Sequence, residues 1–265
     1  MPLVNFVSQL YKMKLLLPQQ QYGFCHAPVC AVRKEPSDCT EMVTQLTFGE
    51  TVEIRDQHAH WIEITSLTDG YTGYVDRRHL IGISEKELRK WHDERQIQTK
   101  LSVTISTPWG SQMTPAGSFM GDHTNFNIGK YVFQSENREG KFKEESFRSS
   151  FLNVPYLWGG KTSFGIDCSG LTQLYYRLLG INLPRDAAQQ QQEGLQVDLN
   201  EAQESDLFFY QNASGKVTHV GLYMADQQIY HASGRVRLDL LKDGNIWNEE
   251  LGEITHQFHS IKRYL

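Results

Sequence analysis

The sequence predicts an α+β protein of three modules, in which two small β modules precede a larger α+β domain. The chain has 265 residues and a mass of 30.5 kDa, which is more than one domain usually contains. Short strand-like runs separated by turns fill the first half, whereas strand, helix and hairpin signals follow one another after about residue 141. We therefore expect modules at residues 1–83, 84–140 and 141–265.

The composition is that of an ordinary globular protein, with 39% apolar and 22% charged residues. The formal net charge of −5 argues against nucleic acid as the main partner. No apolar run is long enough to cross a bilayer, and polar residues interrupt the N-terminal arm MPLVNFVSQLYKMKLLLPQQQYG, which shows no signal cleavage site. We expect a cytoplasmic monomer with neither nucleic acid nor membrane as partner; export by an atypical leader is the alternative.

The first module is expected to be a small β-barrel. Its strand-like runs are short, rich in β-branched and aromatic residues, and separated by turn residues. The expected strands are Val29–Arg33, Glu41–Leu46, Thr51–Arg55, Trp61–Thr65 and Tyr71–Val75. So many short strands in one small module favour a barrel, because closure leaves no exposed sheet edge.

A helix is expected to link the two β modules. The segment Ser84–Gln98 begins with Ser84 and has Glu87 three residues later, which is the pattern of a capping box. Residues 100–133 are again rich in strand and turn signals and predict the second β module. Residues 141–152 are expected to form a helical lead-in to the last domain, and the Gln189–Gln192 tract to lie on a helix surface.

The motif Asp167-Cys168-Ser169-Gly170 begins a predicted buried helix. Apolar residues recur at helical spacing after it, and a glycine supplies the C-terminal stop: Leu171, Leu174, Tyr175, Leu178 and Gly180. Cys168 would lie in the first turn, where unpaired N–H groups and the helix dipole favour thiolate over thiol. Nearby, Gly160-Lys161-Thr162 does not fit a phosphate loop, because Pro155 stands where the first glycine is needed.

Two histidines are expected to meet across a β-hairpin. The runs Val217–Met224 and Gln228–Ala232 have the pattern of neighbouring strands. A three-residue loop between them places His219 and His231 on one face as diagonal neighbours, whereas a two-residue loop would place them on opposite faces. With Cys168 they form a candidate Cys–His–His nucleophilic set, and a zinc site made by the same three residues is the alternative.

No metal or cofactor is expected elsewhere. Cys25, His26, Cys30 and Cys39 contain zinc-binding residue types but lack the CxxC spacing of a strong zinc motif. The other interpretation of these cysteines is small buried or half-buried thiols.

Several motifs together resemble one known family. They are PYLWGGKTSFGIDCSG at 155–170, LPRDA at 183–187, DLFF at 206–209, HVGLY at 219–223 and IYHASGRV at 229–236. In this order they resemble the NlpC family, papain-like cysteine peptidases that cut bacterial cell-wall peptides. The two β modules resemble the bacterial SH3-type domains of the sub-group that hydrolyses γ-D-glutamyl–diamino acid bonds. One departure is Ser205, where the family usually has glycine.

The resemblance implies a papain-like catalytic domain preceded by two SH3-like β-barrel domains. It also implies that Cys168 is the nucleophile, His219 the general base and then acid, and His231 the residue that orients His219. The backbone N–H of Cys168 and the side chain of Tyr156 would bind the oxyanion. Trp158 and Ser169 would line the pocket for the D-glutamyl residue, and core packing is the alternative for Trp158.

A further expectation concerns a free α-amine on the substrate. An ammonium in a closed pocket needs carboxylates and a hydroxyl, because an unpaired buried charge is costly. Asp186 resembles the family's amine-binding acid, and Glu41 (or Asp38) and Tyr71 of the first module would complete the site. Alternatively, the two acids are solvated loop charges and Tyr71 is a barrel residue.

The predicted function is therefore hydrolysis of the γ-D-glutamyl–diamino acid bond of murein peptides that carry a free N-terminal L-Ala. Two alternatives remain at this point. One is a wall-binding or partner-binding protein with a silent catalytic domain. The other is a thiol amidase or acyltransferase that acts on a non-wall substrate.

Overall fold

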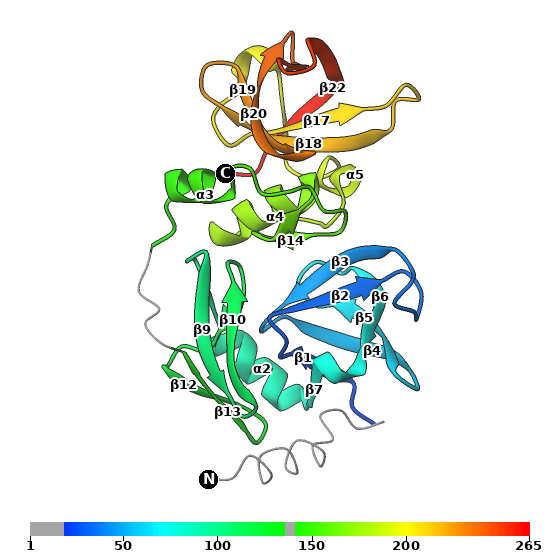
Figure 1. The fold of residues 1–265 in the computed structure, drawn as a ribbon, viewed down its shortest axis with the longest axis vertical. Coiled ribbons are helices and arrows are strands. Elements are labelled where there is room, and N and C mark those ends of the chain that lie inside the picture. The colour runs from blue at the N-terminus through cyan, green and yellow to red at the C-terminus, as the bar shows by residue number, and fades with distance from the viewer. Residues whose placement is uncertain (1–18, 136–140) are drawn as a thin grey trace. The chain divides into compact units, whose positions relative to one another are not determined.

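The computed structural model describes residues 19–135 and 141–265, so most of the expected N-terminal arm lies outside the described residues. The chain divides into two compact units, Met1–Lys141 and Phe142–Leu265 (Figure 1). No helix in the described ranges is long and apolar enough to span a membrane.

The first unit begins with an antiparallel sheet of seven described strands in the order β3-β2-β6-β5-β4-β1-β7. The strands are β1 (Tyr22–Cys25), β2 (Val29–Arg33), β3 (Met42–Thr47), β4 (Thr51–His58), β5 (Trp61–Ser66), β6 (Thr72–Asp76) and β7 (Leu80–Ile83). A 3-10 turn at Arg77–His79 separates the last two. All five strands expected in this module are confirmed, with bounds that differ by at most three residues at either end.

Helix α2 (Glu85–Glu94) has the predicted capping box between Ser84 and Glu87. It ends at Glu94 rather than at Gln98, because the next residues form a strand that pairs with β11. The short pair is β8 (Gln96–Ile97) with β11 (Phe119–Met120). A second sheet has the order β10-β9-β13-β12, with β9 (Ser102–Thr107), β10 (Gly110–Pro115), β12 (Asn125–Ile128) and β13 (Tyr131–Ser135).

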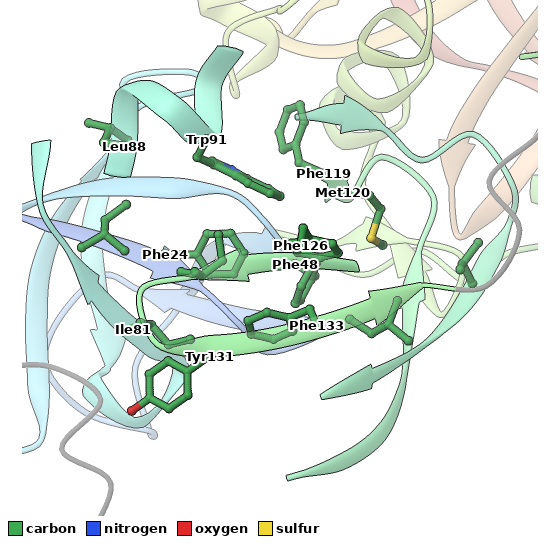
Figure 2. Close-up of a cluster of buried hydrophobic side chains, with 14 residues drawn as sticks. Phe24, Phe48, Ile81, Leu88, Trp91, Phe119, Met120, Phe126, Tyr131 and Phe133 are labelled. Atoms are coloured by element: carbon green, nitrogen blue, oxygen red, sulfur yellow. The ribbon is translucent and has the colours of Figure 1, made fainter. Parts of the chain in front are cut away.

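The two β modules of the first unit share one aromatic core (Figure 2). The Phe24 ring, from the first sheet, lies 5.0 Å from the Trp91 ring of α2, and the Phe48 ring lies 5.5 Å from the Phe133 ring of the second sheet. The indole N–H of Trp91 donates to the carbonyl oxygen of Gly49 at 2.9 Å. Because burial of large aromatic side chains dominates core energetics, this cluster ties both modules and α2 into one body.

The second unit combines helices with a closed barrel. The helices are α3 (Glu144–Phe151), α4 (Cys168–Leu178) and α5 (Ala187–Gln190), and a 3-10 turn covers Leu199–Glu201. The strands are β14 (Lys161–Thr162), β15 (Gly165–Ile166), β16 (Leu195–Val197), β17 (Leu207–Gln211), β18 (Val217–Met224), β19 (Gln228–Ser233), β20 (Arg235–Lys242), β21 (Asn245–Asn248) and β22 (Glu253–Arg263). The large sheet has the order β16-β22-β17-β18-β19-β20-β21, and a further pairing of β21 with β22 closes β17–β22 into a barrel.

Helix α4 is the buried helix that the sequence predicts. Every residue from Cys168 to Leu178 is buried, and the helix packs against β18 and β19. Gly180, which follows it, has φ +86°, the left-handed conformation that commonly ends a helix. The start of this helix, and with it Cys168, is thereby fixed against the barrel.

The structure shows how serine is accommodated at position 205, where the family usually has glycine. Its φ of 75° lies in the left-handed region that favours glycine. The hydroxyl groups of Tyr175 and Tyr176, both from α4, bond to the Ser205 hydroxyl at 2.6 Å and to its carbonyl oxygen at 2.7 Å. These hydrogen bonds offset the strain that a non-glycine residue incurs there.

Candidate active site

Cys168 is the first residue of α4, and a network of hydrogen bonds around Asp167 fixes this helix start. The Asp167 carboxylate accepts from the backbone N–H groups of Gly170 at 2.7 Å and Gly159 at 2.8 Å. A Cβ at Gly170 would lie only 2.3 Å from the carbonyl oxygen of Gly160. The glycine of the Asp-Cys-Ser-Gly motif is therefore required by the close approach of the loop that precedes the helix.

A buried ion pair completes this network. The side chain of Arg185 is 1% exposed, and its guanidinium donates to both carboxylate oxygens of Asp167, at 2.6 and 3.0 Å. It also donates to the hydroxyl of Ser169 at 2.9 Å. Ser169, expected to line the substrate pocket, lies buried in this network with its hydroxyl already engaged.

The histidine pair is found as the sequence predicts. Strands β18 and β19 pair Gly221 with His231 and Met224 with Gln228, which confirms the three-residue loop. Nε2 of His219 lies 2.8 Å from Nδ1 of His231. A Cβ at Gly221 would lie 2.7 Å from Cγ1 of Ile229 and 2.9 Å from Cβ of His231, so a glycine is needed where these two side chains approach β18.

The hydrogen-bonded chain continues beyond the two histidines, to residues that sequence reasoning missed. Nε2 of His231 lies 3.0 Å from Oδ2 of Asp239. The other carboxylate oxygen of Asp239 accepts from Nε and Nη2 of Arg237, at 3.0 and 2.8 Å. Nη1 of Arg237 in turn donates to Glu250 at 2.9 Å. His231, Asp239 and Arg237 are all buried inside the barrel.

A third histidine, also missed, lies against the pair. Barrel closure brings His256 of β22 to a ring distance of 4.2 Å from His219 and 5.8 Å from His231. Burial lowers the pKa of His219 well below its usual value, and the neighbouring His256 and His231 lower it further. Burial also lowers the pKa of His256, to about 4. The imidazole of His219 is therefore neutral at neutral pH and able to accept a proton.

The expectation of a lowered thiol pKa is wrong for Cys168. Burial raises the pKa of the Cys168 thiol to about 12, with the Asp167 carboxylate as the second cause. The backbone N–H groups of Val220 and Ser169 bond to the sulfur and oppose this rise without cancelling it. With this raised pKa the sulfur is a thiol at neutral pH, so the thiolate forms by proton transfer during the reaction.

The remaining predicted residues of this unit lie near the helix start or its flank. Tyr156 is half-buried, and burial together with the charge of a Cys168 thiolate raises the pKa of its hydroxyl, so the hydroxyl keeps its proton. Trp158 is 59% exposed, so the core-packing alternative for it is wrong. Asp186 is half-buried at the start of α5, where its N–H donates to the side chain of Gln189 at 3.2 Å.

One glutamine of the tract expected on a helix surface is instead fully buried. The side-chain amide of Gln190 donates to the carbonyl oxygens of Pro184 at 2.8 Å and Ser169 at 3.1 Å. Its side-chain oxygen accepts from the hydroxyl of Thr172 at 2.8 Å. The surface interpretation fails because α5 is only four residues long and turns Gln190 toward α4. The residue connects the LPRDA loop to the catalytic helix.

The other predicted substrate-binding residues belong to the first unit. Glu41 is exposed and forms an ion pair with Lys34 at 3.5 Å, and Asp38 is exposed as well. Tyr71 is half-buried in the turn before β6, where its N–H donates to Asp69 at 3.2 Å. Their part in substrate binding stays a prediction.

The cysteines considered as zinc ligands do not gather into a metal site. Within the described ranges, the metal-ligand atoms that lie close enough together to hold an ion are those of Asp56, His58 and Glu63, on the solvent side of β4 and β5. Cys25 and Cys30 are buried in the first sheet, where the Cys30 sulfur lies 3.2 Å from a ring nitrogen of His79, and Cys39 is exposed.

The fold and the site define a papain-like cysteine peptidase, with Cys168 at the helix start and the histidine pair on the barrel. Comparison with known proteins identifies the families of its domains. Residues 153–255 match the NlpC/P60 family, and residues 32–80 match the bacterial dipeptidyl-peptidase SH3 domain. The chain therefore contains an NlpC/P60 cysteine peptidase domain and a bacterial dipeptidyl-peptidase SH3 domain.

Two curated relatives align over both units. The gamma-D-glutamyl-L-lysine dipeptidyl-peptidase of Bacillus subtilis is 28% identical over 73% of this chain and 74% of its own length. Dipeptidyl-peptidase 6 of Lysinibacillus sphaericus is 25% identical over 75% of this chain and 83% of its own length. A crystal structure of an NlpC/P60 family protein from Bacillus cereus covers 92% of this chain and 99% of its own, with a TM-score of 0.74 and 19% identity, and shares the fold.

Proposed function

We propose that this protein hydrolyses the γ-D-glutamyl–diamino acid bond of murein peptides. The observation that carries the proposal is the buried Cys168 at the start of α4, which packs against β18, the strand on which His219 is hydrogen-bonded to His231. The printed names of the two curated relatives support the choice of bond, because both are dipeptidyl-peptidases and one is named for γ-D-glutamyl-L-lysine.

The chemistry follows from the charges of the resting site. The Cys168 proton passes to a ring nitrogen of His219 as the sulfur attacks the γ-carbonyl carbon of the D-glutamyl residue. The tetrahedral intermediate collapses to a thioester, and the imidazolium of His219 gives its proton to the departing amine of the diamino acid. Water, deprotonated by the same imidazole, then hydrolyses the thioester and releases the dipeptide.

We assign two donors to the developing oxyanion. The backbone N–H of Cys168 belongs to the first turn of α4, where N–H groups have no partner within the helix. The hydroxyl of Tyr156 keeps its proton because its pKa is raised, and it can donate to the same oxygen. Donors fixed in advance at such a position contribute strongly to acyl-transfer rates.

The proposal includes recognition of a free N-terminal L-Ala. Asp186, at the flank of the catalytic helix, is the acid we assign to the substrate ammonium. Cytoplasmic action on recycled wall fragments is consistent with such a requirement, since a free amine distinguishes a released peptide from one still attached to the glycan.

The experiment that tests the proposal compares two isomeric tripeptides, L-Ala-γ-D-Glu-L-Lys and its α-linked isomer. The expected result is release of free lysine and L-Ala-D-Glu from the γ-linked peptide alone. Chromatography of the reaction mixture detects both products. The same peptide with meso-diaminopimelate in place of lysine shows which diamino acid is preferred. No release from any murein peptide would contradict the proposal and favour a silent binding protein or a thiol enzyme with a non-wall substrate.

A further inference from the structure

We propose that Asp239, clamped by Arg237, is a positioning residue that sets the tautomers of both active-site histidines and so makes Nδ1 of His219 the nitrogen that takes the Cys168 proton. The inference rests on the cysteine-hydrolase chemistry of the proposed function, but it concerns residues that this chemistry does not itself require. It starts from one unbroken line of hydrogen bonds inside the barrel.

The first step is the charge of Asp239. Burial opposes its ionisation, yet the hydrogen bonds from His231 and Arg237 outweigh burial and keep the pKa of the carboxyl below its usual value. Arg237 donates two hydrogen bonds to a single carboxylate oxygen, Oδ1. The other oxygen, Oδ2, is left for His231 at 3.0 Å. An ionised carboxylate can only accept hydrogen bonds, so Nε2 of His231 must carry a proton.

The second step passes this constraint to His219. A neutral imidazole has one N–H, so protonation of Nε2 leaves Nδ1 of His231 as an acceptor. Nδ1 lies 2.8 Å from Nε2 of His219, which must therefore be the donor. His219, also neutral, then has its lone pair on Nδ1. That nitrogen can accept the thiol proton, whereas the opposite tautomer could not.

The third step concerns the imidazolium that forms when the proton is transferred. His219 faces His231 of β19, His256 of β22 and Tyr210 of β17, and the backbone N–H of the next residue, Val220, bonds to the sulfur of Cys168. Burial lowers the pKa of both neighbouring histidines, so they add no positive charge at neutral pH. The negative charge that compensates the His219 imidazolium is that of Asp239, to which His219 is linked through His231. The hydrogen bonds from Arg237 keep the Asp239 carboxylate ionised, so it does not take the proton from His231.

Glu250 completes the set of charged groups around the Asp239–Arg237 pair. It accepts from Arg237 at 2.9 Å and also pairs with Arg235, while Asn248 lies 3.4 Å from Nη2 of Arg237. The two arginines and two acids are formally neutral together, so this group of four side chains adds no net charge to the site. Within this group, Oδ2 of Asp239 is the atom that contacts His231.

The test uses the isosteric change Asp239→Asn. Because Arg237 offers only donors, it should hold the amide oxygen of the new side chain and turn the amide NH2 toward His231. His231 then has to accept at Nε2 and donate at Nδ1, which leaves the proton of His219 on Nδ1. We expect kcat on L-Ala-γ-D-Glu-L-Lys to fall about 100-fold or more with KM changed less than about threefold; the equivalent wrong-tautomer change in serine peptidases costs about 10⁴ in kcat.

A second variant separates this effect from lost packing. In Asp239→Asn combined with Arg237→Met, the amide is free to turn its oxygen toward His231, so we expect kcat to recover at least about tenfold over the single variant. The matched control is Asp243→Asn, an exposed aspartate in the turn after β20 with φ 51°, a conformation that asparagine tolerates. It should behave as the wild type.

Two readouts need no substrate and so separate failure of this inference from failure of the proposed function. Alkylation of Cys168 by iodoacetamide at pH 7, followed by peptide mass spectrometry, should slow about tenfold or more in Asp239→Asn and recover in the double variant. In the wild type, 15N NMR should show His219 protonated at Nε2, the signal being assigned by its loss in His219→Gln. Normal turnover and alkylation in Asp239→Asn, a double variant no better than the single one, or a resting His219 protonated at Nδ1 would each overturn the inference.

Discussion

Cys168 is a neutral thiol and His219 a neutral imidazole before the reaction starts. These two protonation states determine how activity depends on pH. Protonated His219 cannot accept the thiol proton, so activity is lost as the pH falls through the pKa of His219 in the folded enzyme. Burial holds that pKa well below 6.5. We therefore expect the acid limb of kcat/KM to lie well below pH 6.5, followed by a plateau up to about pH 10, because the thiol pKa is raised to about 12.

The check is a profile of kcat/KM on the γ-linked tripeptide from about pH 4 to pH 10, with stability followed in parallel by tryptophan fluorescence. An acid limb centred at 6.5 or above, with the protein still folded, would contradict the buried neutral imidazole. It would instead indicate a resting thiolate–imidazolium pair.

Asp239 shows why the individual residues of the site were only partly predictable. In the stretch Arg237–Leu241, period-two alternation suggests that Leu238 and Leu240 point inward, yet both are more than 40% exposed, whereas Arg237 and Asp239 are buried. The charges face inward because they satisfy His231 and one another. One available signal was the hairpin at Gly234, which extends the β19 register and pairs His231 with Arg237.

At the scale of elements, the start of α4 depends on one buried ion pair. Removal of Arg185 would leave the Asp167 carboxylate buried without its cation, which costs about 3–5 kcal/mol. Arg185→Met should therefore lower the free energy of unfolding of the catalytic domain by about that amount in urea titrations. It should also lower kcat, because the Gly159–Gly160 loop and the helix start are both held by Asp167.

The matched control is Arg89→Met on α2. That arginine is 75% exposed on its side chain and pairs with Glu85 at 2.5 Å on the helix surface, an arrangement that contributes at most about 1 kcal/mol. If the two variants lost similar stability, the Asp167–Arg185 pair would not be what fixes the catalytic helix.

The elements themselves followed closely from local patterns, where those patterns were strong. The capping box at Ser84, the apolar spacing after Cys168 and the odd loop between β18 and β19 are all confirmed. Contacts between distant segments were not predictable. His256 reaches His219 only because β21 and β22 close the barrel, and Gln190 is buried only because α5 is too short to present a free face.

At the scale of the whole molecule, the proposed function requires recognition of the substrate amine. We expect N-acetylation of L-Ala-γ-D-Glu-L-Lys to lower kcat/KM at least about tenfold, the scale of one lost charged hydrogen bond. Asp186→Asn in the second unit and Tyr71→Phe in the first should each lose most of that discrimination. The controls are Asp243→Asn and Tyr74→Phe, the latter another half-buried tyrosine of the first sheet.

If free and N-acetylated peptides are cleaved equally, Asp186 does not bind an ammonium. The first unit would then act in wall binding or in stability rather than in substrate choice. If Asp186→Asn alone loses the discrimination, amine recognition belongs to the catalytic domain, and Tyr71 and Glu41 are ordinary residues of the barrel and its loop.

The central claim is that Cys168 attacks the γ-carbonyl and carries the dipeptide as a thioester. The most direct measurement is acid quenching of the enzyme during turnover of L-Ala-γ-D-Glu-L-Lys, with mass spectrometry of the intact protein and of its peptides. We predict an added mass equal to L-Ala-D-Glu less one water, found on the peptide that contains Cys168 and released by hydroxylamine. Cys168→Ala should show neither adduct nor lysine release while unfolding at the same urea concentration as the wild type. Lysine release by a folded Cys168→Ala variant, or an adduct on another residue, would contradict the claim.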